Sequence, residues 1–305
     1  MTPQPRLAVV DCPTGLAGNM LLAALLDLGL PEAAVHAPLA ALGLAEAYRL
    51  EMAEGRSGGL RGLQLEVALT EPAPSHRHWG DLRQQLAAAP LEPRLKQRVL
   101  AVFGLLAEAE GAVHGHGPEQ VHFHEVGAVD ALVDVVGVCA GLEHFGIREL
   151  ICTPPPAGHG RVNTAHGWLP LPAPAVLELA RRQAVPLASS EGFPAAELTT
   201  PTGLALMAAL ADRFGQIPAL LPEAVGVGLG SRVLDRPNLL RLVLAQAAPA
   251  AGVEQLEPLL QQQAQIDDAT AEDLAFLMEA LRQAGALDVF AQAVQMKKGR
   301  PATLI

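Results

Sequence analysis

The sequence has few aromatic residues and few cysteines. Aromatic residues make up 3% of the chain, although half of its residues are apolar. The core must therefore consist mainly of alanine, leucine and valine, which suits helices packed on a sheet. The three cysteines, Cys12, Cys139 and Cys152, include no C-x-x-C pair. This pattern excludes a disulfide framework and favours a reducing compartment, so we expect a cytoplasmic protein.

Basic runs, a signal peptide and long uncharged apolar segments are missing as well. The net charge of −11 argues against the phosphate backbone of a nucleic acid as a partner. The first apolar stretch is interrupted by Asp11 and Cys12, unlike that of a signal peptide. The apolar segment 126–145 carries Asp130, Asp134 and Glu143, which argues against a membrane span. We therefore expect neither nucleic acid nor membrane as a partner.

The length and the turn residues indicate two domains. A chain of 305 residues with 29 glycines and 25 prolines can bury a sizeable core and makes many tight turns. The stretch 247–252, Ala-Ala-Pro-Ala-Ala-Gly, is the best linker candidate. We predict an α/β domain at residues 1–247 and a linker at residues 248–255. Residues 256–305 are predicted to be the first part of a second domain. Within the first domain, residues 154–174 are expected to form a loop.

The strongest chemical signal is a cluster of histidines and carboxylates. Side chains two apart on an extended chain face the same side, so His122 and His124 can face one site. Asp130 and Asp134 lie four apart on an apolar helix, where two buried carboxylates require a cation nearby. Imidazole and carboxylate ligands suit nickel, zinc, copper and iron. The candidate metal ligands are His114, His116, His122, His124, Glu125, Asp130 and Asp134.

Two alternatives to a metal site remain open at this stage. Histidine is often an ordinary half-buried residue. An arginine partner for Asp130 and Asp134 would also satisfy the two carboxylates without a metal.

Two short glycine- and threonine-containing turns are candidates for binding phosphate. Each one precedes a predicted helix, whose first N–H groups can hold an anion. The alternatives are a plain connection for the first turn and simple helix capping for the second. The candidate residues are Asp11, Thr14, Gly15, Gly18, Thr199, Thr200, Thr202 and Gly203. The run Gly226-x-Gly228-x-Gly230 before Arg232 is interpreted as structural, and Cys12 as a small buried thiol.

Together, these strings resemble the LarC-type nickel insertion proteins. The resemblance covers nearly the whole chain in order, and the string H-F-H-E-V-G-A-V-D is its most specific part. The matching strings are residues 10–22, 122–130, 165–167, 197–203, 266–268 and 295–301. The resemblance implies insertion of nickel into a bis-thiocarboxylated pyridinium mononucleotide. That reaction depends on CTP with manganese or magnesium, creates a carbon–nickel bond, and supplies the cofactor of lactate racemase-type enzymes.

The resemblance also implies roles for particular residues. His122, His124 and Glu125 would bind or deliver nickel, with Asp130, Asp134 and His114 as candidate helpers. For the phosphates of CTP the candidates are Lys297 and Lys298, as flexible point charges, and Arg300, as a bidentate fork. The implied fold is an α/β domain followed by the opening of a ferredoxin-like α+β domain.

The sequence departs from the family pattern at three places. Asn19 stands where the family usually has aspartate, and only His76 and His78 stand where many members carry a histidine-rich insertion. The family also continues beyond the K-K-G-R-P string. We therefore expect an incomplete second domain that a homo-oligomer or a partner polypeptide completes. Two rival functions stay open, a non-catalytic nickel carrier and a metal-dependent hydrolase.

Overall fold

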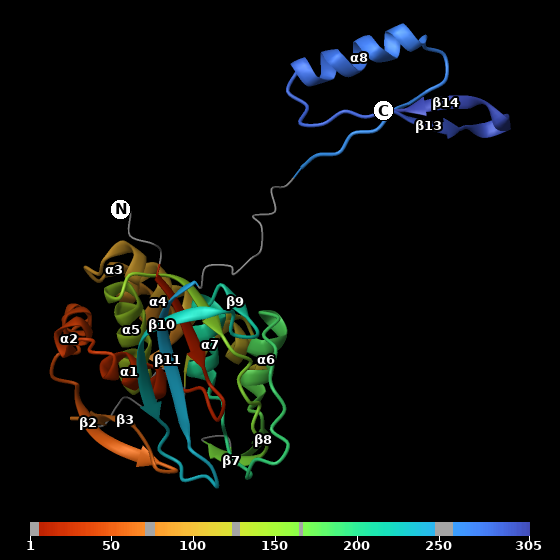
Figure 1. Cartoon of the computed structure of the whole chain (residues 1–305). Coiled ribbons are helices and arrows are strands. Elements are labelled where there is room, and N and C mark those ends of the chain that lie inside the picture. The colour runs from red at the N-terminus through yellow and green to blue at the C-terminus, as the bar shows by residue number, and fades with distance from the viewer. Residues whose placement is uncertain (1–5, 71–76, 124–128, 165–166, 248–258) are drawn as a thin grey trace. The chain divides into compact units, whose positions relative to one another are not determined.

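The computed structural model describes residues 6–70, 77–123, 129–164, 167–247 and 259–305. The chain divides into two compact units, residues 1–249 and residues 250–305. Figure 1 shows the elements of both units.

The first unit is built on a seven-stranded mixed sheet. Its strands, in chain order, are β1 (Arg6–Asp11), β2 (Tyr48–Ser57), β3 (Leu60–Leu69), β6 (Ile147–Cys152), β9 (Arg213–Phe214), β10 (Leu220–Leu229) and β11 (Leu239–Ala247). They lie in the order β2-β3-β10-β11-β1-β6-β9. Strand β1 is antiparallel to β11 and parallel to β6. The expected mixture of helices and strands is confirmed.

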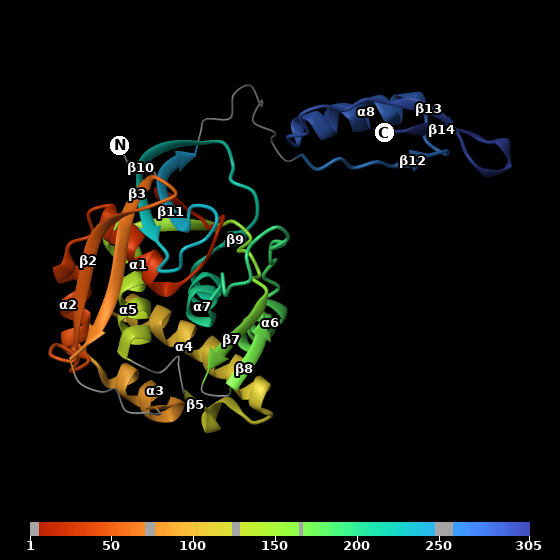
Figure 2. The same cartoon turned by 90° about the horizontal axis from the view of Figure 1, so that it is seen from below.

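The helices of this unit gather on one side of the sheet (Figure 2). They are α1 (Gly18–Asp27), α2 (Glu32–Ala41), α3 (Trp79–Ala88), α4 (Pro93–His114), α5 (Val129–His144), α6 (Pro174–Arg182) and α7 (Pro201–Leu210). Helix α1 contacts β3, β10 and β11 directly. A Cβ atom at Gly226 or Gly228 would lie 2.0 Å from the Ala24 carbonyl oxygen or 1.9 Å from that of Met20. The structural interpretation of these glycines is thus confirmed, because only glycine lets α1 lie so close to β10.

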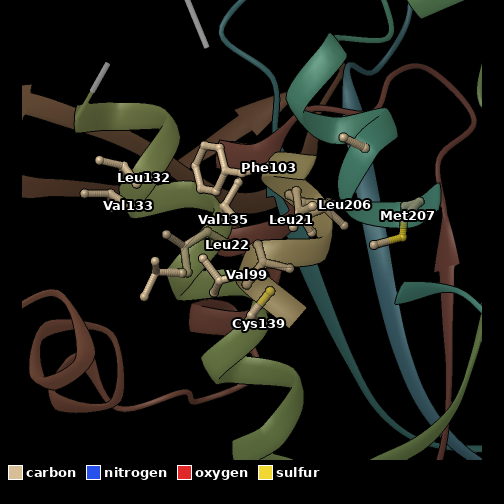
Figure 3. Close-up of a cluster of buried hydrophobic side chains, with 14 of the residues drawn as sticks. Leu21, Leu22, Val99, Phe103, Leu132, Val133, Val135, Cys139, Leu206 and Met207 are labelled. Atoms are coloured by element: carbon tan, nitrogen blue, oxygen red, sulfur yellow. The ribbon is translucent and has the colours of Figure 1, made fainter. Parts of the chain in front are cut away.

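The core lies where α1, α4, α5 and α7 meet (Figure 3). Leu21 and Leu22 of α1, Phe103 of α4 and Leu132 of α5 are each at most 2% exposed. Burial of one such side chain contributes about 1.5–3 kcal/mol. The core holds α1 and α5 against each other, and these helices carry the candidate residues Gly18 on α1 and Asp130 and Asp134 on α5.

The structure corrects the expected loop at residues 154–174. It contains an antiparallel hairpin formed by β7 (Gly160–Thr164) and β8 (Gly167–Leu171). Two further elements, α2 and β2, were not predicted from the sequence. Helix α2 contains Pro38. In β2, Tyr48, Leu50 and Met52 alternate with polar residues, but most of the strand is exposed. Strand β2 forms because all ten of its residues pair with β3.

The described part of the second unit contains a small antiparallel sheet, one α-helix and a short 3-10 helix. Its elements are β12 (Gln265–Ile266), α8 (Ala271–Gln283), β13 (Gln292–Gln295) and β14 (Pro301–Leu304). The strands lie in the order β12-β14-β13. Thr270 and Asp273 form a capping box that starts α8. The ferredoxin-like fold of this unit stays a prediction.

No helix in the described ranges combines the length and the apolar character needed to cross a bilayer.

Candidate functional site

The turn that follows β1 and the loop that precedes α7 are joined by hydrogen bonds. The backbone N–H of Leu16 donates to the Leu198 carbonyl over 2.8 Å, and the N–H of Thr200 donates to the Leu16 carbonyl over 3.0 Å. The Thr200 hydroxyl accepts from the N–H of Gly203 over 3.1 Å and so caps α7. A Cβ at Gly203 would lie 2.4 Å from the Leu16 oxygen. The two candidate phosphate turns are therefore one continuous structure.

This joined structure forms part of a cavity of about 220 Å³. A third segment, residues 230–238, also lines the cavity. The lining residues are Thr14, Ala17, Asn19, Met20, Glu197, Leu198, Thr200, Gly230, Ser231, Arg232, Leu234 and Asn238. In the sequence, this third segment is marked only by the glycine run that precedes Arg232, which was interpreted as structural.

Two of the candidate threonines use their hydroxyls to hold the backbone. The Thr14 hydroxyl donates to the Leu239 carbonyl over 2.9 Å and accepts from the Leu239 N–H over 3.0 Å. The Thr199 hydroxyl donates to the Pro156 carbonyl over 2.7 Å, and Thr199 is 1% exposed. These bonds fix the walls of the cavity and leave little capacity for a ligand at either hydroxyl. Thr202 is half-buried in the first turn of α7.

The carboxylate at the end of β1 is already paired. Both Asp11 and its partner Arg241 lie on adjacent strands, and the Arg241 Nε donates to Asp11 Oδ2 over 2.9 Å. The Asp11 side chain is 12% exposed, whereas that of Arg241 is 53% exposed. Gly15, in the turn that follows β1, must be glycine for a steric reason. A Cβ atom there would lie 2.9 Å from the Leu198 carbonyl oxygen.

Asp134 of α5 lies against the first turn of α1. A Cβ at Gly18 would lie 2.6 Å from Asp134 Oδ2. Asp134 Oδ1 is buried and has no hydrogen-bond partner among the residues that the structure describes. Burial, followed by the charge of Asp130, raises the pKa of Asp134 well above its usual value, and the Asn19 backbone N–H opposes this shift.

The expectation of two buried carboxylates is wrong for one of them. Asp130 is exposed, so it needs no buried cation. No arginine within the described segments forms an ion pair with Asp130 or Asp134. The alternative of an arginine partner is therefore not supported by the described residues, and Asp134 keeps an unpartnered oxygen.

His122 has a histidine neighbour that the sequence analysis did not include among the ligands. The short strands β4 (Arg77–His78) and β5 (His122–Phe123) pair so that His78 faces His122. Their ring centroids are 4.8 Å apart. The His78 Nδ1 accepts from the Gly80 N–H over 3.2 Å and caps α3. His124 and Glu125 lie outside the described residues.

His114 and His116 lie at the carboxyl end of α4. Their rings are stacked with centroids 5.7 Å apart, and His114 Nε2 is 3.5 Å from Glu110 Oε2. Among the described residues, no three histidine, cysteine or acidic side chains form a group that could hold a metal ion. The predicted cluster therefore stays a prediction, since two of its central members are not described.

The interpretation of Cys12 as a small buried thiol is confirmed, and Cys152 is its neighbour. Cys12 and Cys152 are at most 1% exposed, and both thiols donate to the Thr153 carbonyl, over 3.3 and 3.2 Å. A hydrogen bond with Cys152 lowers the pKa of Cys12, and the same bond and burial raise the pKa of Cys152. All three cysteines are free thiols.

Comparison with known proteins identifies the family of this chain. Residues 8–305 match the family described as nickel insertion protein. The chain belongs to the nickel insertion protein family. A relative from Cyanothece sp. is 45% identical over 311 residues, which cover 98% of this chain and 75% of the relative. Relatives from Citrifermentans bemidjiense and Gloeothece citriformis are 44% and 43% identical, again over 98% of this chain and 76% and 75% of their own lengths.

All three relatives carry provisional names as nickel insertion proteins. No solved structure matches the chain. The resemblance seen in the sequence is thus confirmed, and the family assigns nickel insertion in general.

In this member of the nickel insertion protein family, the basic string of the second unit forms a tight turn. Lys297 and Lys298 lie in the short helix η2 (Lys297–Gly299), and Lys298 has a positive φ of 64°. Arg300 follows the turn, with its guanidinium 3.8 Å from a carboxylate oxygen of Asp267. The strings at residues 266–268 and 295–301 are therefore adjacent in this unit, because β12 and β14 pair.

Proposed function

We propose that this chain inserts nickel into pyridinium-3,5-bisthiocarboxylic acid mononucleotide and so forms the nickel-pincer nucleotide. The reaction would be a CTP-dependent cyclometallation, in which a ring carbon–hydrogen bond is exchanged for a carbon–nickel bond. Nickel stays divalent and the ring proton is released. The observation that carries this proposal is the position of Asn19. Asn19 lines the polar cavity, and its backbone N–H forms a hydrogen bond with the Asp134 carboxyl group.

The first turn of α1 therefore lies next to both the cavity proposed to bind the nucleotide and Asp134, the candidate metal ligand. A nickel insertase needs both functions close together, because the metal must reach the ring of the bound nucleotide. Gly18 is the residue that permits this arrangement, since any side chain there would displace Asp134.

On the metal side, Asp134 is the best supported ligand. Burial raises the pKa of Asp134, and its buried Oδ1 atom has no hydrogen-bond partner among the described residues. A divalent cation would favour the ionised form of this carboxyl group. We propose that Asp134 acts with His122, His124, Glu125 and Asp130. His114 and His116, at the end of α4, are proposed as further nickel-binding residues.

On the nucleotide side, the two joined turns are proposed to bind the phosphate of the substrate. Helix α1 begins at an N-cap residue, Ala17, that makes no side-chain capping bond, so backbone N–H groups at this end can serve an anion. Asp11, Thr14, Thr199 and Thr200 would shape the walls through the bonds described above. Close approach of the backbone to the substrate phosphate is proposed at Gly15, Gly18, Thr202 and Gly203.

CTP is proposed to bind the second unit through Lys297, Lys298 and Arg300. Asp267 lies beside Arg300, and a carboxylate in this position suits the magnesium or manganese ion that accompanies a nucleotide. A cytoplasmic location would agree with the three free thiols.

The direct test is nickel insertion by the purified chain. The protein is incubated with nickel, CTP, manganese or magnesium, and the pyridinium mononucleotide, and mass spectrometry follows the nucleotide product and CTP consumption. A double variant, His122→Ala with His124→Ala, should lose nickel and product. His144→Ala is the matched control, because His144 is exposed at the other end of α5. Nickel binding without product or CTP consumption would instead support a carrier.

A further inference from the structure

The loop at residues 230–238 contributes the one cationic side chain of the cavity in the first unit. Of the lining residues, only Arg232 carries a positive charge. Its side chain is exposed, and within the described part of the chain it forms no ion pair. In a chain of net charge −11, an unpaired guanidinium at a polar cavity favours an anionic ligand.

The loop that carries Arg232 is braced by Asn238. The Asn238 Nδ2 donates to the Arg232 carbonyl over 3.0 Å, and the Gly230 N–H donates to the Asn238 carbonyl over 3.1 Å. The N–H of Asn238 donates to the Ser57 hydroxyl over 2.9 Å. A Cβ at Gly230 would lie 2.3 Å from Asn238 Nδ2, so glycine is required for this bracing. The backbone at Arg232 is thus fixed at the cavity before a ligand binds.

The other polar groups of the cavity are already engaged or carry the wrong charge. The hydroxyls of Thr14 and Thr200 bond to the backbone, and Asn19 Nδ2 lies 3.4 Å from the Leu65 carbonyl. Glu197 is anionic and repels a phosphate. Arg232 and the exposed Ser231 are therefore the lining side chains best suited to an anion.

We propose that Arg232, presented by the 230–238 loop, binds the phosphate monoester of the pyridinium mononucleotide, with Ser231 as a second donor. This inference rests on the proposed function and names the residue that recognises its substrate. The cavity volume of about 220 Å³ is smaller than the roughly 300–1,000 Å³ that encloses a drug-sized ligand. It admits the phosphate end of the nucleotide and leaves the ring outside. The guanidinium fork fits two phosphate oxygens at once.

The test uses nicotinic acid mononucleotide, a pyridinium mononucleotide, and its riboside, which lacks the phosphate. Isothermal titration measures both ligands, and separately CTP with magnesium, on the full chain. The variants are Arg232→Met and Arg232→Lys. The matched control is Arg148→Met, which removes an exposed arginine on β6 that does not line the cavity.

Arg232→Met should weaken mononucleotide binding about tenfold or more and leave the riboside and CTP unchanged. Arg232→Lys should fall between, because it keeps the charge and loses the fork. Arg148→Met should bind like the wild type, and all variants should unfold at similar temperatures. Unchanged mononucleotide binding by Arg232→Met, or wild-type binding that does not depend on the phosphate, overturns the inference. The inference is also overturned if Arg232→Met loses CTP binding and keeps mononucleotide binding, because Arg232 would then bind the triphosphate of CTP.

The nickel insertion assay separates this inference from the function on which it rests. If the wild type binds the mononucleotide through Arg232 but makes no product, the proposed function fails and the phosphate site stands. If the wild type makes product and Arg232→Met binds and reacts normally, only the phosphate site fails.

Discussion

Gly18 at the start of α1 lies directly against Asp134 of α5, with room for a hydrogen atom but for no side chain. A Cβ at Gly18 would lie 2.6 Å from Asp134 Oδ2 and 2.8 Å from its Cβ. Gly18→Ala should therefore push the two helices apart and lower the free energy of unfolding by about 1–3 kcal/mol.

Chemical denaturation measures this change, with Gly104→Ala as its control. Gly104 is in α4 and has no heavy atom near its ideal Cβ position. Alanine there should stabilise the protein by up to about 1 kcal/mol. Equal effects of the two substitutions would mean that Gly18 does not have to be glycine for steric reasons.

Asp134 gives the metal-free protein a pH dependence of known sign. Its pKa is raised in the folded state, so its contribution to stability is fully present below the pKa of the unfolded state, about 3.9. That contribution is lost as the pH rises through the folded-state pKa. Asp134→Asn should therefore be more stable than the wild type at neutral pH, and the difference should vanish at low pH. Urea denaturation with a chelator present, repeated across this range, measures it. A difference that grows toward low pH would show that the wild-type carboxylate is stabilised in its charged form.

His78 caps α3 through its Nδ1 atom, and this role can be separated from nickel binding. His78→Ala should lower the free energy of unfolding by about 1 kcal/mol, whereas His78→Asn should retain most of the cap. Both variants should bind as much nickel as the wild type, as measured by metal analysis after dialysis. Nickel loss in His78→Asn with stability retained would add His78 to the metal ligands, through its neighbour His122.

The Asp11–Arg241 pair is expected to act on stability more than on ligand binding. Arg241→Met leaves the nearly buried Asp11 carboxylate without its partner and should cost about 1–3 kcal/mol. Adding Asp11→Asn should restore part of that loss, since the unpaired charge is then removed. Thermal unfolding and mononucleotide titration of the two variants test this. A large loss of affinity for the mononucleotide in the stable double variant would show that Asp11 takes part directly in substrate binding.

The sequence by itself determined the chemical content of the protein. The strings around Asp11, His122, Thr199 and Lys297 identified the family, because such strings reflect chemistry that does not depend on knowing the fold. Composition and patterning likewise predicted the mixed α/β class, since periods of two and near four residues are local properties. Strand β2 and helix α2 were not predicted. Helix α2 contains Pro38, which weakens its local helical signal. Strand β2 has an apolar alternation only from Tyr48 to Met52, and pairing with β3 stabilises its whole length.

Only the tertiary structure decided which of these residues meet. The bond from Leu16 to Leu198 joins two turns that sequence spacing could not relate, because contacts between distant segments depend on the whole chain path. The same folding made Thr14 a support for Leu239, paired Asp11 with Arg241 and brought Arg232 to the cavity. It also exposed Asp130, left Asp134 half-buried as a whole residue and buried the Oδ1 atom of Asp134. The residue type determines which interactions a side chain can form. The packing of distant elements determines which side chains are left free to bind a ligand.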